Sequence, residues 1–175
     1  MGELEYRKLS VGRSEDVSEL QDVLDAAPDY FRRIQGETAC RKQAIRELEI
    51  VPEGYPTEEK SLYLILEEGV PIGCLDMLNG YPETSVAYIG LLLIVESHRG
   101  CGLGRRAADF ADKVGGEWGC AVLRLGVLEH DQNALYFWSR QGFVERYIKR
   151  SSQFTGKIVV MERAIRSSWG PPYKI

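Results

Sequence analysis

Three alternating glycines form the part of the chain best suited to chemistry. The segment Arg99–Gly104 reads RGCGLG, and glycine at every second position removes the Cβ atoms that would keep a ligand away from the backbone. Apolar residues then recur at helical spacing over residues 103–118, so the glycine turn should open a helix. Free amides and the positive dipole end at a helix start attract anions. With added charge from Arg99, Arg105 and Arg106, the segment predicts a phosphate site.

The spacing of the glycines separates different kinds of phosphate site. A nucleoside-triphosphate loop requires GxxxxGK followed by Ser or Thr, and the sequence lacks this pattern. A dinucleotide site requires GxGxxG early in a βαβ unit, whereas this chain has GxGxG late, after two hairpin strands. A glycine-rich turn of this kind is also compatible with a simple tight connection from strand to helix.

A second motif about thirty residues further along favours one interpretation. Asn133–Phe143 reads NALYFWSRQGF, a short amphipathic helix that Gly142 would end as a left-handed cap. Together with Arg99–Gly104, which matches R/QxxGxG/A, this order and spacing resemble the two signatures of the GNAT superfamily of N-acetyltransferases. The resemblance covers about residues 62–163 and is strongest over residues 89–143.

The resemblance implies an enzyme that transfers an acetyl group from acetyl-CoA to a primary amine by direct attack in a ternary complex, without a metal. In this family the central strand and the next strand separate, the pantetheine arm enters between them, and the pyrophosphate binds the glycine loop. Pre-aimed backbone amides at the end of the central strand would polarise the thioester carbonyl. The resemblance assigns acetyl-CoA binding to Leu93, Ile94, Val95, Arg99, Gly100, Cys101, Gly102, Leu103, Gly104, Arg105, Asn133 and Trp138.

Two positions that transfer protons in members of this family carry other residue types here. Trp138 stands where a tyrosine commonly protonates the leaving thiolate, and Gly126 stands where some members carry a glutamate base. An indole N–H is too weak an acid to replace a phenol, so Trp138 is expected to pack against pantetheine. Tyr136 then becomes the candidate acid, and Glu129 and Glu96 become candidate bases.

The acceptor side of the site has no motif of its own. Tyr30 and Phe31 lie in the first third of the chain, where the family places the segments that shape the acceptor pocket, and we expect them to line it with Asp76. Asp76 and His130 are further candidate bases that would act through water. Because both proton-handling positions are replaced, a second class of function stays open, a CoA-binding sensor or interaction module without catalysis.

A mixed sheet is needed to position these residues. The run Ala87–Val95 has no polar alternation and predicts a central strand buried on both faces, and Cys120–Leu128 predicts the next strand. Asp131 or Asn133 would cap the helix that follows. The fold class is α+β, a GNAT fold with a mostly antiparallel, seven-stranded mixed sheet and about four flanking helices. The other strands are expected at residues 4–9, 61–66, 71–78, 143–149 and 157–163, and the helices at 14–27, ended by Pro28, and at 38–48, 103–118 and 133–141.

The length and composition fit one domain that folds alone. The 175 residues are 44% hydrophobic and 27% charged, which is ordinary for a globular protein. We expect the domain over residues 1–166 and a tail over residues 167–175, whose Trp169 and Tyr173 would dock on the domain or on a second copy. The sequence therefore leaves a homodimer open.

Charge, hydropathy and cysteine usage exclude several other classes. The net charge of −4 argues against non-specific nucleic-acid binding, which needs a basic face. The longest apolar run is far shorter than the roughly 20 residues of a membrane span, and the charged start does not resemble a signal peptide. Cys40, Cys74, Cys101 and Cys120 show no metal-ligand spacing, so reduced thiols in a cytoplasmic protein are expected.

Overall fold

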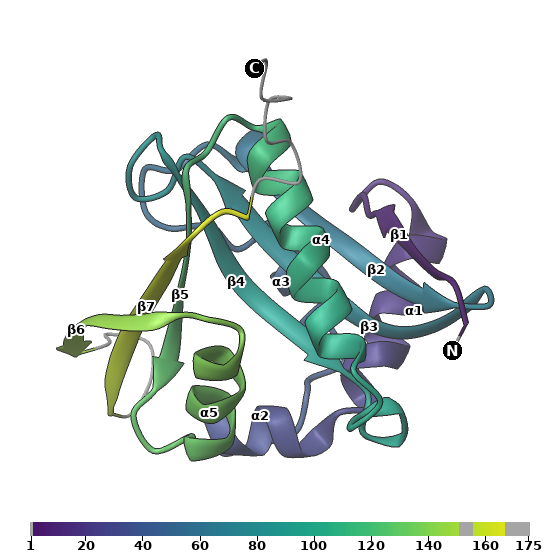
Figure 1. The fold of residues 1–175 in the computed structure, drawn as a ribbon. Coiled ribbons are helices and arrows are strands. Elements are labelled where there is room, and N and C mark those ends of the chain that lie inside the picture. Colours follow the sequence, from purple (N-terminus) through teal and green to yellow (C-terminus); the bar gives the residue numbers. More distant parts are fainter. Residues whose placement is uncertain (1, 151–155, 167–175) are drawn as a thin grey trace.

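One seven-stranded sheet organises the fold, as seen in a computed structural model that describes residues 2–150 and 156–166 (Figure 1). The strand order is β1-β2-β3-β4-β5-β7-β6, and β4 and β5 are the parallel pair among otherwise antiparallel neighbours. The mixed sheet predicted from the sequence is confirmed. The strands are β1 Leu4–Lys8, β2 Lys60–Glu67, β3 Val70–Asn79, β4 Val86–Ile94, β5 Val122–Leu128, β6 Val144–Arg150 and β7 Lys157–Ala164.

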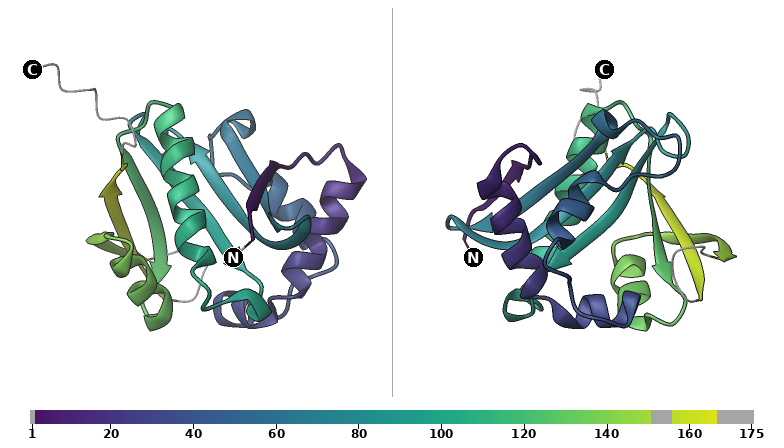
Figure 2. Two further views of the ribbon diagram at one scale, coloured as in Figure 1. Left: turned by 45° about the vertical axis from the view of Figure 1, so that its right-hand side comes forward. Right: turned by 180° about the vertical axis from the view of Figure 1, so that it is seen from behind.

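The described residues form five α-helices, which cover both faces of the sheet. Helix α4 (Leu103–Glu117) crosses one face, while α1 (Ser14–Asp25) and α3 (Gln43–Glu49) lie on the opposite face (Figures 1 and 2). Helices α2 (Pro28–Gln35) and α5 (Gln132–Arg140) lie next to each other, at the end towards which β4 and β5 run. No helix of the described residues has the length and apolar character that a membrane span requires.

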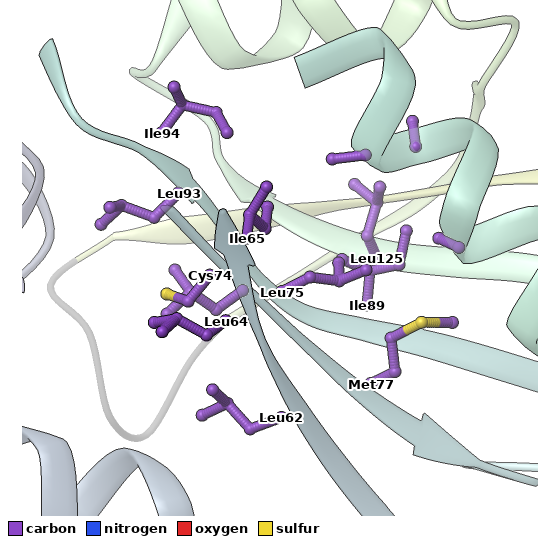
Figure 3. Close-up of a cluster of buried hydrophobic side chains, with 14 of the residues drawn as sticks. Leu62, Leu64, Ile65, Cys74, Leu75, Met77, Ile89, Leu93, Ile94 and Leu125 are labelled. Atoms are coloured by element: carbon purple, nitrogen blue, oxygen red, sulfur yellow. The ribbon is translucent and has the colours of Figure 1, made fainter. Parts of the chain in front are cut away.

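The hydrophobic core occupies both faces of the central strands. Leu64 and Cys74 point to the face that α1 and α3 cover, whereas Met77, Ile89 and Leu125 point towards α4 (Figure 3). Along β4, every side-chain position is buried or half-buried apart from Gly90. The prediction of a central strand buried on both faces is therefore confirmed, and its one exposed position is a glycine.

The parallel pair β4 and β5 separates part of the way along its length. The two strands are paired from Val86–Val122 to Ile89–Leu125, after which β4 continues beside β3 and β5 continues beside β7. Figure 1 shows this separation widening towards α2 and α5. We call the gap beyond the last pair, Ile89 and Leu125, the wedge.

The first third of the chain contains one more helix than the sequence predicts. The sequence places the end of the first helix at Pro28, but α1 already ends at Asp25 and Pro28 is the first residue of α2. A first helical position suits proline because its missing N–H would have no intrahelical partner there. The helix predicted over residues 38–48 begins only at Gln43. The predicted tail over residues 167–175 lies outside the described residues.

A buried ion pair attaches α4 to β7. Nη1 and Nη2 of Arg163 donate to Oδ1 and Oδ2 of Asp112 at 2.7 Å each, and both side chains are buried. Oδ1 of Asp112 also accepts the backbone N–H of Arg166 at 3.1 Å. This charge-assisted, bidentate arrangement fixes α4, and the glycine turn at its start, against the far half of the sheet.

Replacement of Asp112 by alanine should lower the free energy of unfolding by about 3–5 kcal/mol, because Arg163 would stay buried without its counter-ion. Urea denaturation measures the loss. The matched control is Asp109→Ala on the same helix, whose 3.3 Å pair with Arg166 is half-exposed, and which should cost less than about 1 kcal/mol. Equal losses in the two variants would contradict the role assigned to Asp112.

Candidate functional site

The wedge holds two adjoining pockets. The loop pocket has a volume of about 390 Å³ and is lined by Leu92 and Ile94 of β4, by the glycine loop, by Phe137 of α5 and by Gln141, which follows α5. The inner pocket has a volume of about 160 Å³ and is enclosed by β4, β5, α2 and α5. Leu92 lines both, so the two pockets are consecutive parts of one site along the free edge of β4.

The glycine loop presents bare backbone to the loop pocket. Gly100 and Gly102 both have φ of 80°, a left-handed conformation that L side chains rarely adopt, and a Cβ at either position would point into open space. Gly102 is the N-cap of α4, so the first amides of a 15-residue helix face the same side. The predicted helix start is confirmed, and open amides at such a start favour an anionic group.

The three arginines near this loop have different surroundings. Nε of Arg99 donates to the carbonyl oxygen of Ile94 at 2.8 Å, which ties the loop back to the end of β4. Arg105 lines the loop pocket. Arg106 turns away, because its Nη1 donates to the carbonyl oxygen of Gly2 at 2.9 Å. Arg106 is therefore not among the residues that line the loop pocket.

Only part of the predicted set of β4 backbone amides points towards the wedge. The N–H of Val95 donates to the carbonyl oxygen of Ile72 at 2.9 Å, within the pairing with β3. Since hydrogen bonds alternate along an antiparallel ladder, Leu93 is also directed towards β3, while Leu92 and Ile94 direct their amides towards the wedge. Of the three predicted donors, Ile94 therefore directs its amide towards the wedge, as Leu92 does, whereas Leu93 and Val95 direct theirs towards β3.

The two positions that depart from the family pattern are filled by packing. A Cβ on Gly126 would lie 2.8 Å from Cγ2 of Ile158 and 3.0 Å from the hydroxyl oxygen of Tyr88, so these two side chains would have to shift to accept a longer side chain here. Trp138 lines the inner pocket, where it is buried and packs edge-on against Phe143. Both positions therefore shape the pocket without supplying a group that exchanges protons.

Two ionisable side chains of the described residues line the inner pocket, Tyr30 and Asp131. Tyr30 comes from α2, and its burial raises the pKa of the phenol well above its ordinary value of 10, with a smaller contribution from Glu47. Asp131 caps α5, because its Oδ1 accepts the N–H of Ala134 at 3.1 Å, and its Oδ2 lies 4.0 Å from Nε of Arg33. The predicted capping role of Asp131 is confirmed, and Tyr30 is the phenol that the structure places in the pocket.

The three candidate proton-transfer residues lie elsewhere on the surface. Tyr136 is 65% exposed and its hydroxyl accepts a hydrogen bond from Arg140 at 3.3 Å. Glu129 is exposed beside Lys157 at 3.7 Å, and Glu96 is exposed beside Arg99 at 3.9 Å. Within the described part of the chain, none of the three lines either pocket. Their assignment as acid and bases stays a prediction, which these contacts do not support.

The remaining predicted residues divide between the wall of the site and its support. Phe31 is fully buried in the core and packs edge-on against Tyr30, so it does not line the inner pocket. Leu103 is buried beneath the loop, and Gly104 lines the loop pocket against Phe137. Cys101, Asn133 and His130 are exposed. The described residues contain no cluster of His, Cys, Asp or Glu that could hold a metal ion.

Gly90 is a position of the site that sequence reasoning missed. Asp76 pairs with Leu91 and Met77 pairs with Ile89, which leaves Gly90 as the extra residue of a β-bulge in the middle of β4. Gly90 is exposed and lines the inner pocket, and a Cβ placed on it would overlap Oδ2 of Asp76. A single glycine within a strand pattern is the signal that could have indicated this bulge.

Comparison with known proteins gives a consistent result. A family model described as "Acetyltransferase (GNAT) family" matches residues 20–143. The crystal structure of an acetyltransferase from Thermus thermophilus superposes with a TM-score of 0.74 at 28% identity, covering 94% of this chain and 99% of that one. A GNAT family acetyltransferase from Elizabethkingia anophelis with acetyl-CoA bound superposes with a TM-score of 0.63 at 12% identity, covering 92% and 97%.

One curated relative adds a local match in sequence. It is an uncharacterised N-acetyltransferase from the pepI 3′ region of Lactobacillus delbrueckii subsp. lactis, and it is 47% identical over 45 residues. The match covers 26% of this chain and about a quarter of the length of that protein. The likeness to it is therefore confined to one segment.

Addition of a methyl group at Gly126 should lower the free energy of unfolding by about 1–3 kcal/mol, because the new Cβ would press on Ile158 and on the Tyr88 hydroxyl. Thermal or urea denaturation of Gly126→Ala tests this. The control is Gly116→Ala in α4, where the new Cβ meets only Cγ2 of Ile165 at 3.8 Å. It should gain about 0.5–1 kcal/mol from reduced backbone entropy. A stable Gly126→Ala protein would mean that the site does have room there.

Proposed function

The chain belongs to the GNAT family of acetyltransferases, and from that premise we propose that it transfers the acetyl group of acetyl-CoA to the nitrogen of a primary amine. The observation that carries this proposal is the wedge, which joins an open glycine loop at a helix start to a pocket beside the free edge of β4. An anion, an extended chain and a small acyl group would each find suitable contacts along it.

The residues of the wedge fit the parts of acetyl-CoA in order. Amides at Gly100, Gly102 and Gly104, with the Arg105 side chain, would bind the pyrophosphate through charge-assisted hydrogen bonds. The amides of Leu92 and Ile94 would pair with the pantetheine arm and direct a donor at the thioester carbonyl, where negative charge develops when the amine attacks. The reaction forms a C–N bond and breaks the C–S bond within one ternary complex, mainly through orientation.

Tyr30 is proposed as the proton donor to the departing thiolate. Its side chain lines the inner pocket from α2, as Trp138 does from α5, so the pocket has a phenol although residue 138 is not a tyrosine. A tyrosine phenol is protonated at neutral pH, as an acid must be before it reacts.

A CoA-binding sensor without catalysis is the second candidate. It is motivated by Trp138 and Gly126, which stand at the two positions where members of the family carry proton-transferring residues. The two candidates are separated by release of free thiol from acetyl-CoA in the presence of polyamines, aminoglycosides, amino acids and peptides with free N-termini. Release with at least one amine supports the enzyme. Tight binding of acetyl-CoA with no release above background from any of them supports the sensor.

Replacement of Gly102 by valine should weaken CoA binding by about 100-fold, which corresponds to two lost charge-assisted hydrogen bonds of roughly 1.5 kcal/mol each. Isothermal titration calorimetry measures the affinity. The matched control is Gly119→Val, since Gly119 has φ of 77° and open space around its Cβ but lies at the other end of α4. It should share the backbone strain and retain affinity. Unchanged CoA affinity in Gly102→Val would count against the loop as the phosphate site.

Replacement of Tyr30 by phenylalanine should lower kcat by about 100-fold while CoA affinity stays the same, because the phenol is proposed to act on the sulfur only as it departs. Tyr136→Phe is the matched control, because its hydroxyl is exposed on the outer side of α5. Its rate should match that of the wild-type protein. A rate loss in Tyr136→Phe with full activity in Tyr30→Phe would reverse the assignment.

A further inference from the structure

A buried carboxylate lies directly behind the bulge of β4 and is not used by the steps described above. Asp76 on β3 is 6% exposed, and Lys60 on β2 is 8% exposed, with Nζ of Lys60 at 2.6 Å from Oδ1 of Asp76. Charged groups are rarely buried to this extent in a small domain, because transfer out of water is costly even for a close pair. A buried pair beside a ligand pocket is therefore a candidate functional group.

The bulge gives this carboxylate access to the inner pocket. Oδ2 of Asp76 occupies the space that a Cβ on residue 90 would need. Gly90 is exposed and lines the inner pocket, so no side chain at this position separates the carboxylate from the pocket. Since the wedge opens immediately after Ile89, Asp76 lies at the point where the free edge of β4 begins.

The charges around Asp76 leave it able to accept a proton near neutral pH. Burial raises the pKa of Asp76 from 3.8 to about 6, and the positive charge of Lys60 opposes this increase. The other ionisable neighbours are Glu47 on α3, which raises the pKa of Asp76 further, Cys74 on β3 and Tyr55, which precedes β2. The adjacent positions of β4, Ile89, Gly90 and Leu91, carry no charge. A base with a pKa near 6 is largely ionised at pH 7 and still basic enough to take a proton.

We propose that Asp76 is the base of the transfer reaction and that it takes the proton of the acceptor amine through a water molecule held at the gap left by Gly90. This inference rests on the proposed acetyl transfer. As the C–N bond forms and the C–S bond breaks, the proton leaves nitrogen for Asp76 and passes to solvent, while the thiolate takes a proton from Tyr30, which solvent restores. Lys60 remains protonated and holds Oδ1, while Oδ2 lies beside Gly90, which lines the pocket.

The alternative to this proposal is a purely structural ion pair between β2 and β3. The two roles differ in how kcat depends on pH, because only a base must lose its proton before each turnover. In the wild-type protein, kcat should rise with pH through about 6 and then level off, since protonated Asp76 cannot act. If the pair is only structural, removal of the Asp76 carboxylate would lower the free energy of unfolding and would leave the dependence of kcat on pH as it is in the wild-type protein.

The test measures kcat against pH for Asp76→Asn, with saturating acetyl-CoA and the amine of the panel that releases most thiol. We expect kcat at pH 7.5 to fall by about 100-fold and the rise through pH 6 to disappear, with CoA affinity retained. Gly90→Ala should also lower kcat, because its Cβ would displace Oδ2. Asp16→Asn is the control, since Asp16 is a fully buried acid on α1 whose carboxylate accepts the N–H of Ser10 at 3.0 Å, and it should keep the wild-type profile.

A second variant covers the case in which Asp76→Asn does not fold. In the double variant Lys60→Met with Asp76→Asn, both charges of the pair are removed together, which is far less destabilising than removal of one. The same loss of rate and of the pH dependence is expected. A folded variant of either kind with the wild-type pH profile would overturn the role of Asp76 alone. Absence of thiol release by the wild-type protein with every amine would overturn the proposed function, and the role of Asp76 with it.

Discussion

The early end of the hydrogen bonding between β4 and β5 is the constraint on which the rest of the structure depends. Beyond Ile89 and Leu125, the facing edge of β4 keeps backbone donors and acceptors that no strand satisfies. Buried backbone groups of this kind need partners, so such an edge is stable only beside solvent or a ligand. The surrounding elements keep the two strands apart: β3 holds β4, β7 holds β5, and α5 fills the open end with Trp138.

The glycines of the site serve this separation in different ways. Gly100 and Gly102 allow left-handed turns that expose amides, whereas Gly126 makes room for the side chains of Ile158 and Tyr88. Gly90 allows a carboxylate from the neighbouring strand to lie against β4. The same residue type thus provides backbone donors in one place, packing space in another and access to a buried charge in a third.

Much of the fold could be predicted from the sequence because its signals are local. The uniformly apolar run that forms β4, the helical stripe after Leu103 and the two motifs depend on neighbours a few residues apart. The second helix is not predicted because Pro28 is equally compatible with the end of one helix and the start of another. The site residues are harder to predict, because Tyr30 reaches the pocket from about a hundred residues before α5, and Tyr136 points outward although it is two residues from Trp138.

The short pairing between β4 and β5 also divides the sheet into two halves, β1 to β4 and β5 with β7 and β6, joined by four residue pairs and by α4. A co-substrate lying in the wedge would touch β4, the loop before α4 and α5 at once, and so would bridge both halves. Occupancy of the wedge would then raise the free energy of unfolding, because a ligand that binds only the native state stabilises that state by mass action. A bound co-substrate would therefore pair with the free edge of β4, and the ligand-free protein would have the lower free energy of unfolding.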